Sequence, residues 1–284
     1  MHTRQSGLVL ITVLWLISLL TLLATATLAI ARSHTRLATR AAQTITAETI
    51  ADSALRLTLL QVREPLSPGR ELGFAAHWRL EVLAREIEIR VEREAGRVDL
   101  NAADAPLLAA VFTAGGTDPG IAHSFASRIL DWRDTDEQPE RDGAEDLDYE
   151  RAHVAYRPRN GPFESIGELR QVLGLTELSP TVVDAFTVYS TRSPLITPEF
   201  AHPLAHKALE LLARSPSLPY TPFAAFGAQG LLGQVVRAHA CVNIEAVTTC
   251  RAVIARLMDD RYKPFLIYAW YTEPPASTTR PTAE

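Results

Sequence analysis

The stretch LVLITVLWLISLLTLLATATLAI, residues 8–30, decides how this chain is organised, because its 23 positions contain no charged residue. As an α-helix it is about 35 Å long, which exceeds the roughly 30 Å hydrocarbon core of a bilayer. The pattern therefore predicts a membrane-spanning helix. A cleaved signal peptide is the alternative, with the small-residue triplets at 24–26 or 29–31 as cleavage sites, although its apolar region is usually only about 7 to 15 residues long.

The helical pattern continues beyond the apolar stretch. No glycine or proline occurs from Leu8 to Glu64, and Ile50, Ala54 and Leu57 recur at helical spacing. We therefore predict one helix of about 55 residues. Its first half, 8–30, lies in the membrane, and its second half, 31–64, forms a stem outside it.

The rest of the chain alternates between β and α patterns. Ile87, Ile89 and Val91 alternate with charged residues and predict a half-exposed strand, and Val98 with Leu100 predicts a second strand after a turn at Ala95-Gly96. Helical patterns follow at 104–111, at 121–132 and after a capping box at 165–168, and further strands are predicted over 233–240, 249–257 and 265–271.

Composition restricts the classes of function. A net charge of −5 argues against a nucleic-acid partner held by counterion release. No Ser/His/Asp arrangement, phosphate-binding glycine loop or HExxH motif occurs, which favours a non-enzymatic protein. Cys241 and Cys250 flank a short connection between two predicted strands, so in an oxidising compartment we expect a disulfide there, and two separate buried thiols are the alternative.

An acidic stretch is the one group of residues that points to site chemistry. Its acidic members are Asp131, Asp134, Asp136, Glu137, Asp142, Glu145, Asp146 and Asp148. Carboxylates at short, irregular spacing around a glycine suit Ca²⁺, which accepts flexible oxygen coordination. The preferred ligands are Asp134, Asp136, Glu145 and Asp148. A solvated acidic surface loop is the alternative reading.

The N-terminus resembles that of type IV pilins and pseudopilins, in which a short basic leader ends in glycine before an apolar helix. The resemblance implies that a prepilin peptidase cuts between Gly7 and Leu8 on the cytoplasmic side and methylates the new terminus. Most members carry glutamate at mature position five, where this chain has Thr12. A subunit with no other subunit ahead of it, at a filament tip, has no need of that glutamate.

One feature opposes this orientation. The basic residues Arg32, Arg36 and Arg40 follow the span, whereas the leader carries only Arg4. The positive-inside rule would place the arginine side in the cytoplasm. We give more weight to the leader.

The middle of the chain resembles the K-type minor pseudopilins of the type II secretion system. The phrases that carry the resemblance are AGRVDLNAADAPLL, ILDWRDTDE, DGAEDLDY, YRPRNGPFESIGELRQVLGL and FTVYS. The chain departs from the family at LITPEFAHPLAHKALELLA (195–213), where an asparagine-rich phrase is expected. The resemblance implies an α+β fold, with a pilin-like long N-terminal helix on an antiparallel sheet and a large helical domain inserted between strands.

The resemblance also implies a domain order and a role. The expected segments are a leader (1–7), a membrane half (8–30) and a stem half (31–64) of the helix, a body (65–100 and 231–271), an inserted domain with its connecting loop (101–230) and a flexible tail (272–284). The expected role is a non-enzymatic pseudopilus tip subunit in the bacterial inner membrane, with its body in the periplasm, a structural Ca²⁺ and other minor pseudopilins as partners. A membrane-anchored periplasmic binding protein and a minor pilin of a type IV pilus are the alternatives.

Overall fold

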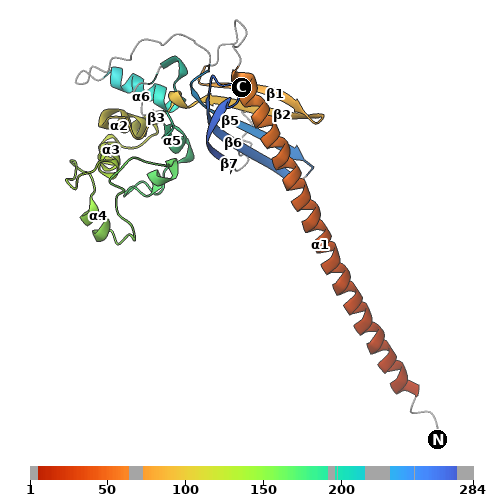
Figure 1. Ribbon diagram of the computed structural model, residues 1–284. Helices are drawn as coiled ribbons and strands as arrows, with labels where there is room; N and C mark the ends of the chain where they lie inside the picture. The colour runs from red at the N-terminus through yellow and green to blue at the C-terminus, as the bar shows by residue number, and fades with distance from the viewer. Residues whose placement is uncertain are drawn as a thin grey trace, which may run out of the picture.

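The computed structural model describes residues 6–63, 73–190, 196, 198–214, 231–245 and 247–273. Helix α1 (Ser6–Arg63) is a rod of 58 residues that projects from the body, with the N-terminus at its free end (Figure 1). Side chains 10–42 are all exposed, and this half of the helix is long and apolar enough to cross a membrane. The single continuous helix predicted from the sequence is confirmed.

The second half of α1 packs on the sheet. The residues on its inner face are fully buried and recur every three or four positions: Ala47, Ala51, Ala54, Leu55 and Leu59. The alanines allow the helix backbone to approach the sheet closely, while the leucines fill the space between the two layers. Contacts with β5 (Val235–Ile244) and β6 (Val247–Leu257) dominate this interface.

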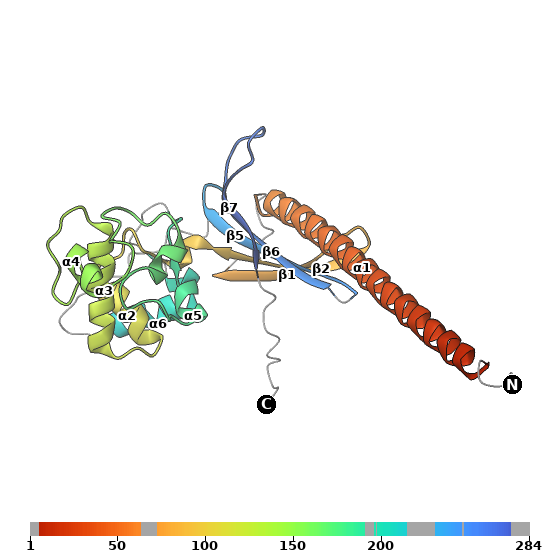
Figure 2. The ribbon, with the colours of Figure 1, turned by 90° about the horizontal axis from the view of Figure 1, so that it is seen from below.

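The sheet has five antiparallel strands in the order β1-β2-β5-β6-β7. Its remaining strands are β1 (Ala75–Val82), β2 (Arg85–Arg93) and β7 (Phe265–Glu273). Leu83 and Ala84 form the tight β1–β2 turn with positive φ angles. Helix α1 covers one face of the sheet (Figure 2).

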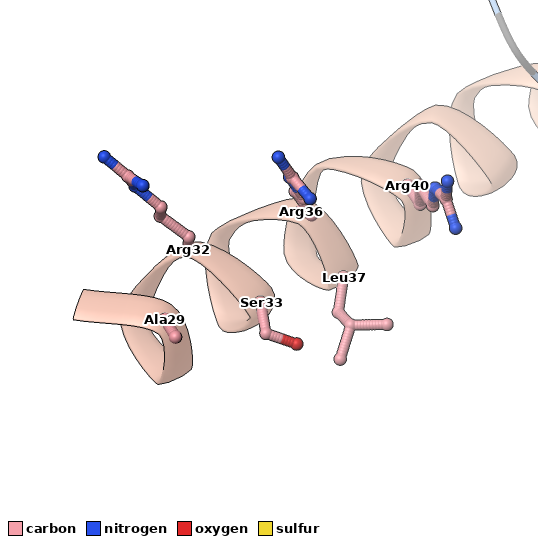
Figure 3. Close-up of a pocket in the computed structure, with 6 residues that line it drawn as sticks. All are labelled: Ala29, Arg32, Ser33, Arg36, Leu37 and Arg40. Atoms are coloured by element: carbon pink, nitrogen blue, oxygen red, sulfur yellow. The ribbon is translucent and has the colours of Figure 1, made fainter. Parts of the chain in front are cut away.

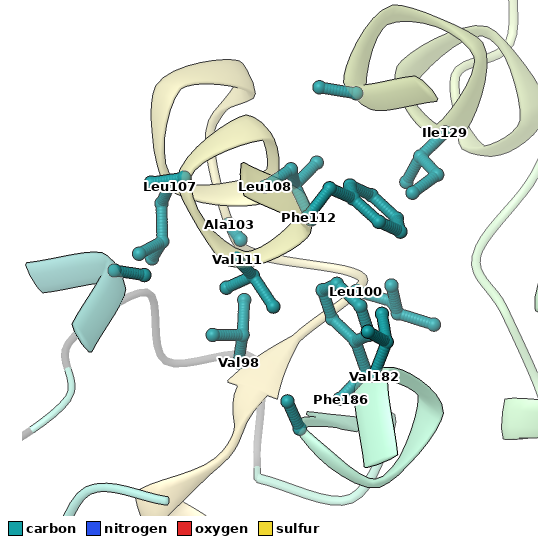
Figure 4. Close-up of a cluster of buried hydrophobic side chains, with 14 of the residues drawn as sticks. Val98, Leu100, Ala103, Leu107, Leu108, Val111, Phe112, Ile129, Val182 and Phe186 are labelled. Atoms are coloured by element: carbon teal, nitrogen blue, oxygen red, sulfur yellow. The ribbon is translucent and has the colours of Figure 1, made fainter. Parts of the chain in front are cut away.

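The chain between β2 and β5 forms a separate helical domain with its own apolar core (Figure 4). Its helices are α2 (Ala105–Ala114), α3 (Pro119–Arg133), α4 (Asp146–Arg151), α5 (Pro180–Asp184) and α6 (Pro203–Ala213), and its strands β3 (Val98–Asp99) and β4 (Phe186–Thr187) pair in parallel. Short 3-10 turns lie at Glu94–Gly96 (η1), Ile166–Arg170 (η2) and Pro198–Phe200 (η3). The predicted fold, with a helical insertion between strands, is confirmed.

Local signals explain where these helices begin. The side chains of Asp104, Asp118 and Ser179 accept hydrogen bonds from the first backbone amides of α2, α3 and α5. Each of these helices has a proline in its first turn, where the missing N–H costs nothing. The capping box of Ser165 and Glu168 is present as predicted, although it begins the 3-10 turn η2 rather than an α-helix.

The predicted body differs from the structure at two of its strands. Val98 and Leu100 do not extend the body sheet, because β3 pairs with β4 and both residues are buried in the core of the helical domain. The chain crosses between domains at Gly96, where a Cβ atom would lie 2.1 Å from the Phe200 carbonyl oxygen. Strand β1 has no counterpart among the predicted strands. Residues 1–5 of the predicted leader and the tail beyond Glu273 lie outside the described residues, and the last two leader residues, 6 and 7, begin α1.

Candidate metal centre and domain junction

The acidic loop between α3 and α4 is closed by a buried aspartate. Asp131, in the last turn of α3, is fully buried, and its two oxygens accept backbone hydrogen bonds from Glu140 (2.9 Å) and Ala144 (2.6 Å). The loop passes so close to this carboxylate that a Cβ atom on Gly143 would lie 1.9 Å from Asp131 Oδ2. Asp131 therefore holds the loop in shape through both of its oxygens.

Three of the four predicted ligands meet inside this loop. Carboxylate oxygens of Asp134, Asp136 and Glu145 lie within 4.8 Å of one another. Glu145 is 4% exposed, and both of its oxygens, together with Oδ1 of Asp134, are buried without a hydrogen-bond partner. Buried carboxylate oxygens are costly when nothing compensates them. A cation is the simplest partner that would satisfy all of them.

The electrostatics of the loop favour a positive charge at this point. Burial, reinforced by the neighbouring carboxylates, raises the pKa of Glu145 to about 7. Burial, and after it the charges of the neighbouring carboxylates, also raise the pKa of Asp134 to about 6. A bound cation would reverse both effects, because it stabilises the ionised carboxylates.

The donor set indicates which cation fits. Every converging atom is a carboxylate oxygen, with no nitrogen or sulfur among them. Such a set suits a hard cation, and the irregular loop suits the flexible coordination of Ca²⁺ better than the strict octahedron of Mg²⁺. The residues present therefore fit the ion that the family resemblance implies.

The other acidic residues of the loop have different partners. Asp148 accepts a hydrogen bond from the Glu145 amide with one oxygen (3.2 Å) and pairs with Arg151 through the other (3.0 Å). Asp146 pairs with Arg157 at 2.6 Å. The structure thus does not bring the fourth predicted ligand into the group.

A second site, which the sequence did not reveal, joins the helical domain to the sheet. Arg97 is fully buried and donates hydrogen bonds to Glu92 of β2 and to the carboxylate of Asp184 in α5 (3.2 Å). Arg237 of β5 binds the same Asp184 oxygen (3.0 Å) and Glu94 (2.6 Å). Both arginines therefore connect the body to one carboxylate of the helical domain.

The junction carboxylates are held in the ionised form. Burial alone would raise the pKa of Glu92, but hydrogen bonding to His239 and the charges of Arg97 and Arg90 outweigh it and bring the pKa down to about 2. Burial alone would also raise the pKa of Asp184. The hydrogen bond with His202 and the charges of Arg97 and Arg237 outweigh burial, so the pKa of Asp184 is lowered.

His202 explains how the divergent segment 195–213 still forms a helix. Its Nδ1 atom accepts a hydrogen bond from the Leu204 amide (3.2 Å) and caps α6, in place of the asparagine expected from the family. Its Nε2 atom lies 3.5 Å from Asp184, so the residue also contributes to the junction.

The remaining predicted residues are placed as follows. Cys241 and Cys250 face each other across β5 and β6 and form a disulfide. Thr12 lies in the exposed half of α1. Gly7 and Leu8 lie in the first turn of α1.

Comparisons with known proteins agree on one family. Residues 89–186 match the family model described as type II secretion system protein K. The type II secretion system proteins K of Pseudomonas aeruginosa and Klebsiella pneumoniae are each 29% identical, over 204 and 200 residues, and each alignment covers 62% of this chain. The chain spans 60% of the length of each of these relatives.

The fold has a counterpart among solved structures. A chain in the crystal structure of the GspK-GspI-GspJ complex from the enterotoxigenic Escherichia coli type 2 secretion system superposes with a TM-score of 0.58 at 14% identity. The match covers 85% of this chain and 99% of that one. The resemblance inferred from the sequence is therefore confirmed: residues 89–186, which run from strand β2 of the body to strand β4 of the helical domain, match the type II secretion system protein K family.

Proposed function

We propose that this protein is a non-enzymatic minor pseudopilin that caps the tip of a type II secretion pseudopilus and helps to start its assembly with other minor pseudopilins. The family match, the relatives named protein K and the fold shared with the GspK-GspI-GspJ complex support this role. The protein acts through its surfaces and needs no catalytic group.

The position of the helical domain carries the proposal. This domain lies beside the sheet, at the end of the molecule remote from the exposed apolar half of α1 (Figures 1 and 2). In a filament of parallel α1 helices, a subunit added above this one would have to pass through that space. The Arg97–Asp184–Arg237 network, in which both arginines are buried, fixes the domain there. A rigid obstruction at this end suits the first subunit of a filament.

The test is a deletion in the native host, complemented with the full chain. We expect loss of protein secretion in the deletion strain and co-isolation of the complementing chain with small pilin-like proteins. Normal secretion in the deletion strain would refute the proposal. A defect in surface pili with secretion intact would instead assign the chain to a type IV pilus.

Processing and location follow from the same role. The prepilin peptidase would cleave after Gly7 and methylate Leu8, leaving α1 in the inner membrane and the body in the periplasm. The disulfide between Cys241 and Cys250 supports an oxidising compartment.

Intact mass and N-terminal sequencing of the membrane-extracted protein test this processing. A chain that starts at N-methylated Leu8 supports the proposal, and replacing Gly7 by a larger residue should block the cleavage. A start at Met1 would favour an uncleaved anchor, and a start near Ala26 or Ala31 would indicate a signal peptide.

Calcium binding in the acidic loop is part of the proposal. The convergence of Asp134, Asp136 and Glu145, with buried oxygens that lack partners, supports a structural ion that holds an otherwise self-repelling loop. This loop lies in the helical domain, so the ion would stiffen the part of the molecule that we place at the tip.

A further inference from the structure

The part of α1 between the apolar span and the body carries an unusual concentration of positive charge. Arg32, Arg36 and Arg40, here called the arginine stripe, lie one turn apart and are exposed (Figure 3). Among the described residues, no carboxylate forms an ion pair with any of the three. All 33 acidic residues of the chain come after position 47, so no acidic neighbour along the helix neutralises this segment.

The stripe faces a defined direction. Arg36 is 11 positions before Ala47, and Arg40 is 11 positions before Ala51, which is about three helical turns in each case. Ala47 and Ala51 are buried against the sheet. The body ends immediately beyond the stripe, where Gln43 donates a hydrogen bond to Glu245 in the β5–β6 turn (2.6 Å). The stripe therefore faces the space beneath the body, between the sheet and the apolar span.

The positions of the three arginines along the helix axis place their side chains within reach of a membrane surface. Arg32, Arg36 and Arg40 lie about 3, 9 and 15 Å along the helix axis beyond Ile30, where the predicted span 8–30 ends. The headgroup layer of one leaflet is about 5 to 8 Å thick. Helical side chains lean toward the N-terminus, which displaces each guanidinium group toward the membrane, and the arginine stem extends this reach.

We propose that the arginine stripe binds the phosphates of anionic phospholipids at the surface of the membrane that α1 spans, and so sets how deeply the helix is inserted. The guanidinium group is well suited to phosphate, which it binds through two parallel hydrogen bonds. The acidic body would be repelled by an anionic surface, and the basic stripe offsets that repulsion. The inference rests on the proposed membrane span and does not depend on the role at the filament tip.

The test uses the full chain in detergent, titrated with phosphatidylglycerol or phosphatidylcholine, with lipid retention measured by native mass spectrometry. We expect preferential retention of phosphatidylglycerol. Each single Arg→Gln change should lower it by up to about fivefold, in the order Arg32, Arg36, Arg40, because the contribution of a basic residue falls with distance from the surface. The triple Gln variant should lose the preference, and the triple Lys variant should keep most of it.

A matched control removes the same charge elsewhere. Arg79, Arg214 and Arg261 are exposed arginines of the body, and changing these three to Gln should leave lipid retention unchanged. The proposal is overturned if the triple stripe variant still prefers phosphatidylglycerol, or if the control variant loses the preference equally. It is also overturned if the stripe changes matter only when partner pseudopilins are added, since that result would assign the stripe to an acidic protein surface. Secretion by the same variants is measured separately, so that failure of the proposed tip role can be distinguished from failure of lipid binding.

Discussion

Neutralising Glu145 should stabilise the metal-free protein and at the same time abolish its response to calcium. The pKa of this carboxyl is raised from 4.5 to about 7, mainly by burial. A raised pKa in the folded state means that folding favours the protonated form, so stability falls as the pH rises from about 4 to about 7. At about 1.4 kcal/mol per pKa unit, ionised Glu145 costs the metal-free protein up to about 3 kcal/mol at pH 8.

The variant is Glu145→Gln, which keeps the shape of the side chain and removes its charge. Thermal unfolding of the full chain in detergent, with and without a calcium chelator, measures the effect between pH 4 and pH 8. We expect this substitution to raise the stability of the chelator-treated protein at pH 8 and to leave it nearly unchanged at pH 4. Asp142→Asn is the matched control, because this side chain is 63% exposed in the same loop and outside the converging group.

Calcium affinity supplies an independent measurement. Binding must displace the protons held by Glu145 and by Asp134, whose pKa is about 6. The apparent affinity should therefore fall about a thousandfold between pH 8 and pH 5. Isothermal titration with calcium at several pH values measures this slope. A pH-independent affinity, a destabilised Glu145→Gln protein at pH 8, or an unchanged calcium response in that variant would refute the reasoning.

Three further predictions concern the framework around these sites. Replacing Arg97 by Met removes the buried cation bound to Glu92 and Asp184, which keep Arg90 and Arg237 as partners, and should cost about 1.5 to 3 kcal/mol in urea unfolding. Arg79→Met, in an exposed ion pair, should cost less than about 1 kcal/mol. An equal loss in the two variants would contradict a role for burial. Replacing Gly143 by Ala should weaken calcium binding and destabilise the loop by about 1 to 3 kcal/mol, because the new methyl group clashes with a buried carboxylate. Gly73→Ala, which meets nothing within 4 Å, should be neutral in the same two measurements. Replacing Cys241 by Ser removes the disulfide that closes a small loop, and should lower the free energy of unfolding by about 2 to 3 kcal/mol under oxidising conditions. In reductant, where neither protein has the disulfide, the two free energies of unfolding should be equal.

The features that could be predicted from the sequence depend on neighbours along the chain. The absence of glycine and proline up to Glu64 predicted α1 because helical hydrogen bonds connect residues four apart. The alternation of Ile87, Ile89 and Val91 predicted β2, and Ser165 with Glu168 predicted a helical turn. The acidic loop was recognisable as a candidate cation site because its carboxylates are close in sequence.

Contacts between distant segments decided the rest. Val98 resembles a body strand locally, but its partner is Phe186 in the helical domain, and only folding brings the two together. The sequence alone could not separate Asp131, which closes the loop through backbone hydrogen bonds, from carboxylates such as Asp134 that stay without a partner. Which of two chemically equivalent carboxylates keeps free oxygens for a cation depends on what the folded backbone places beside it.

The sequence by itself therefore determined the long helix, the strands β2, β5, β6 and β7, the family resemblance and the acidic loop as a candidate cation site, since each rests on short-range periodicity or on local phrases. Only the tertiary structure decided the position of the helical domain and the network of Arg97, Asp184 and Arg237 that holds it. Ion pairs of this kind join residues roughly 50 to 140 positions apart in the chain. No local pattern encodes such pairs, because the burial that makes them strong exists only after the two domains have packed.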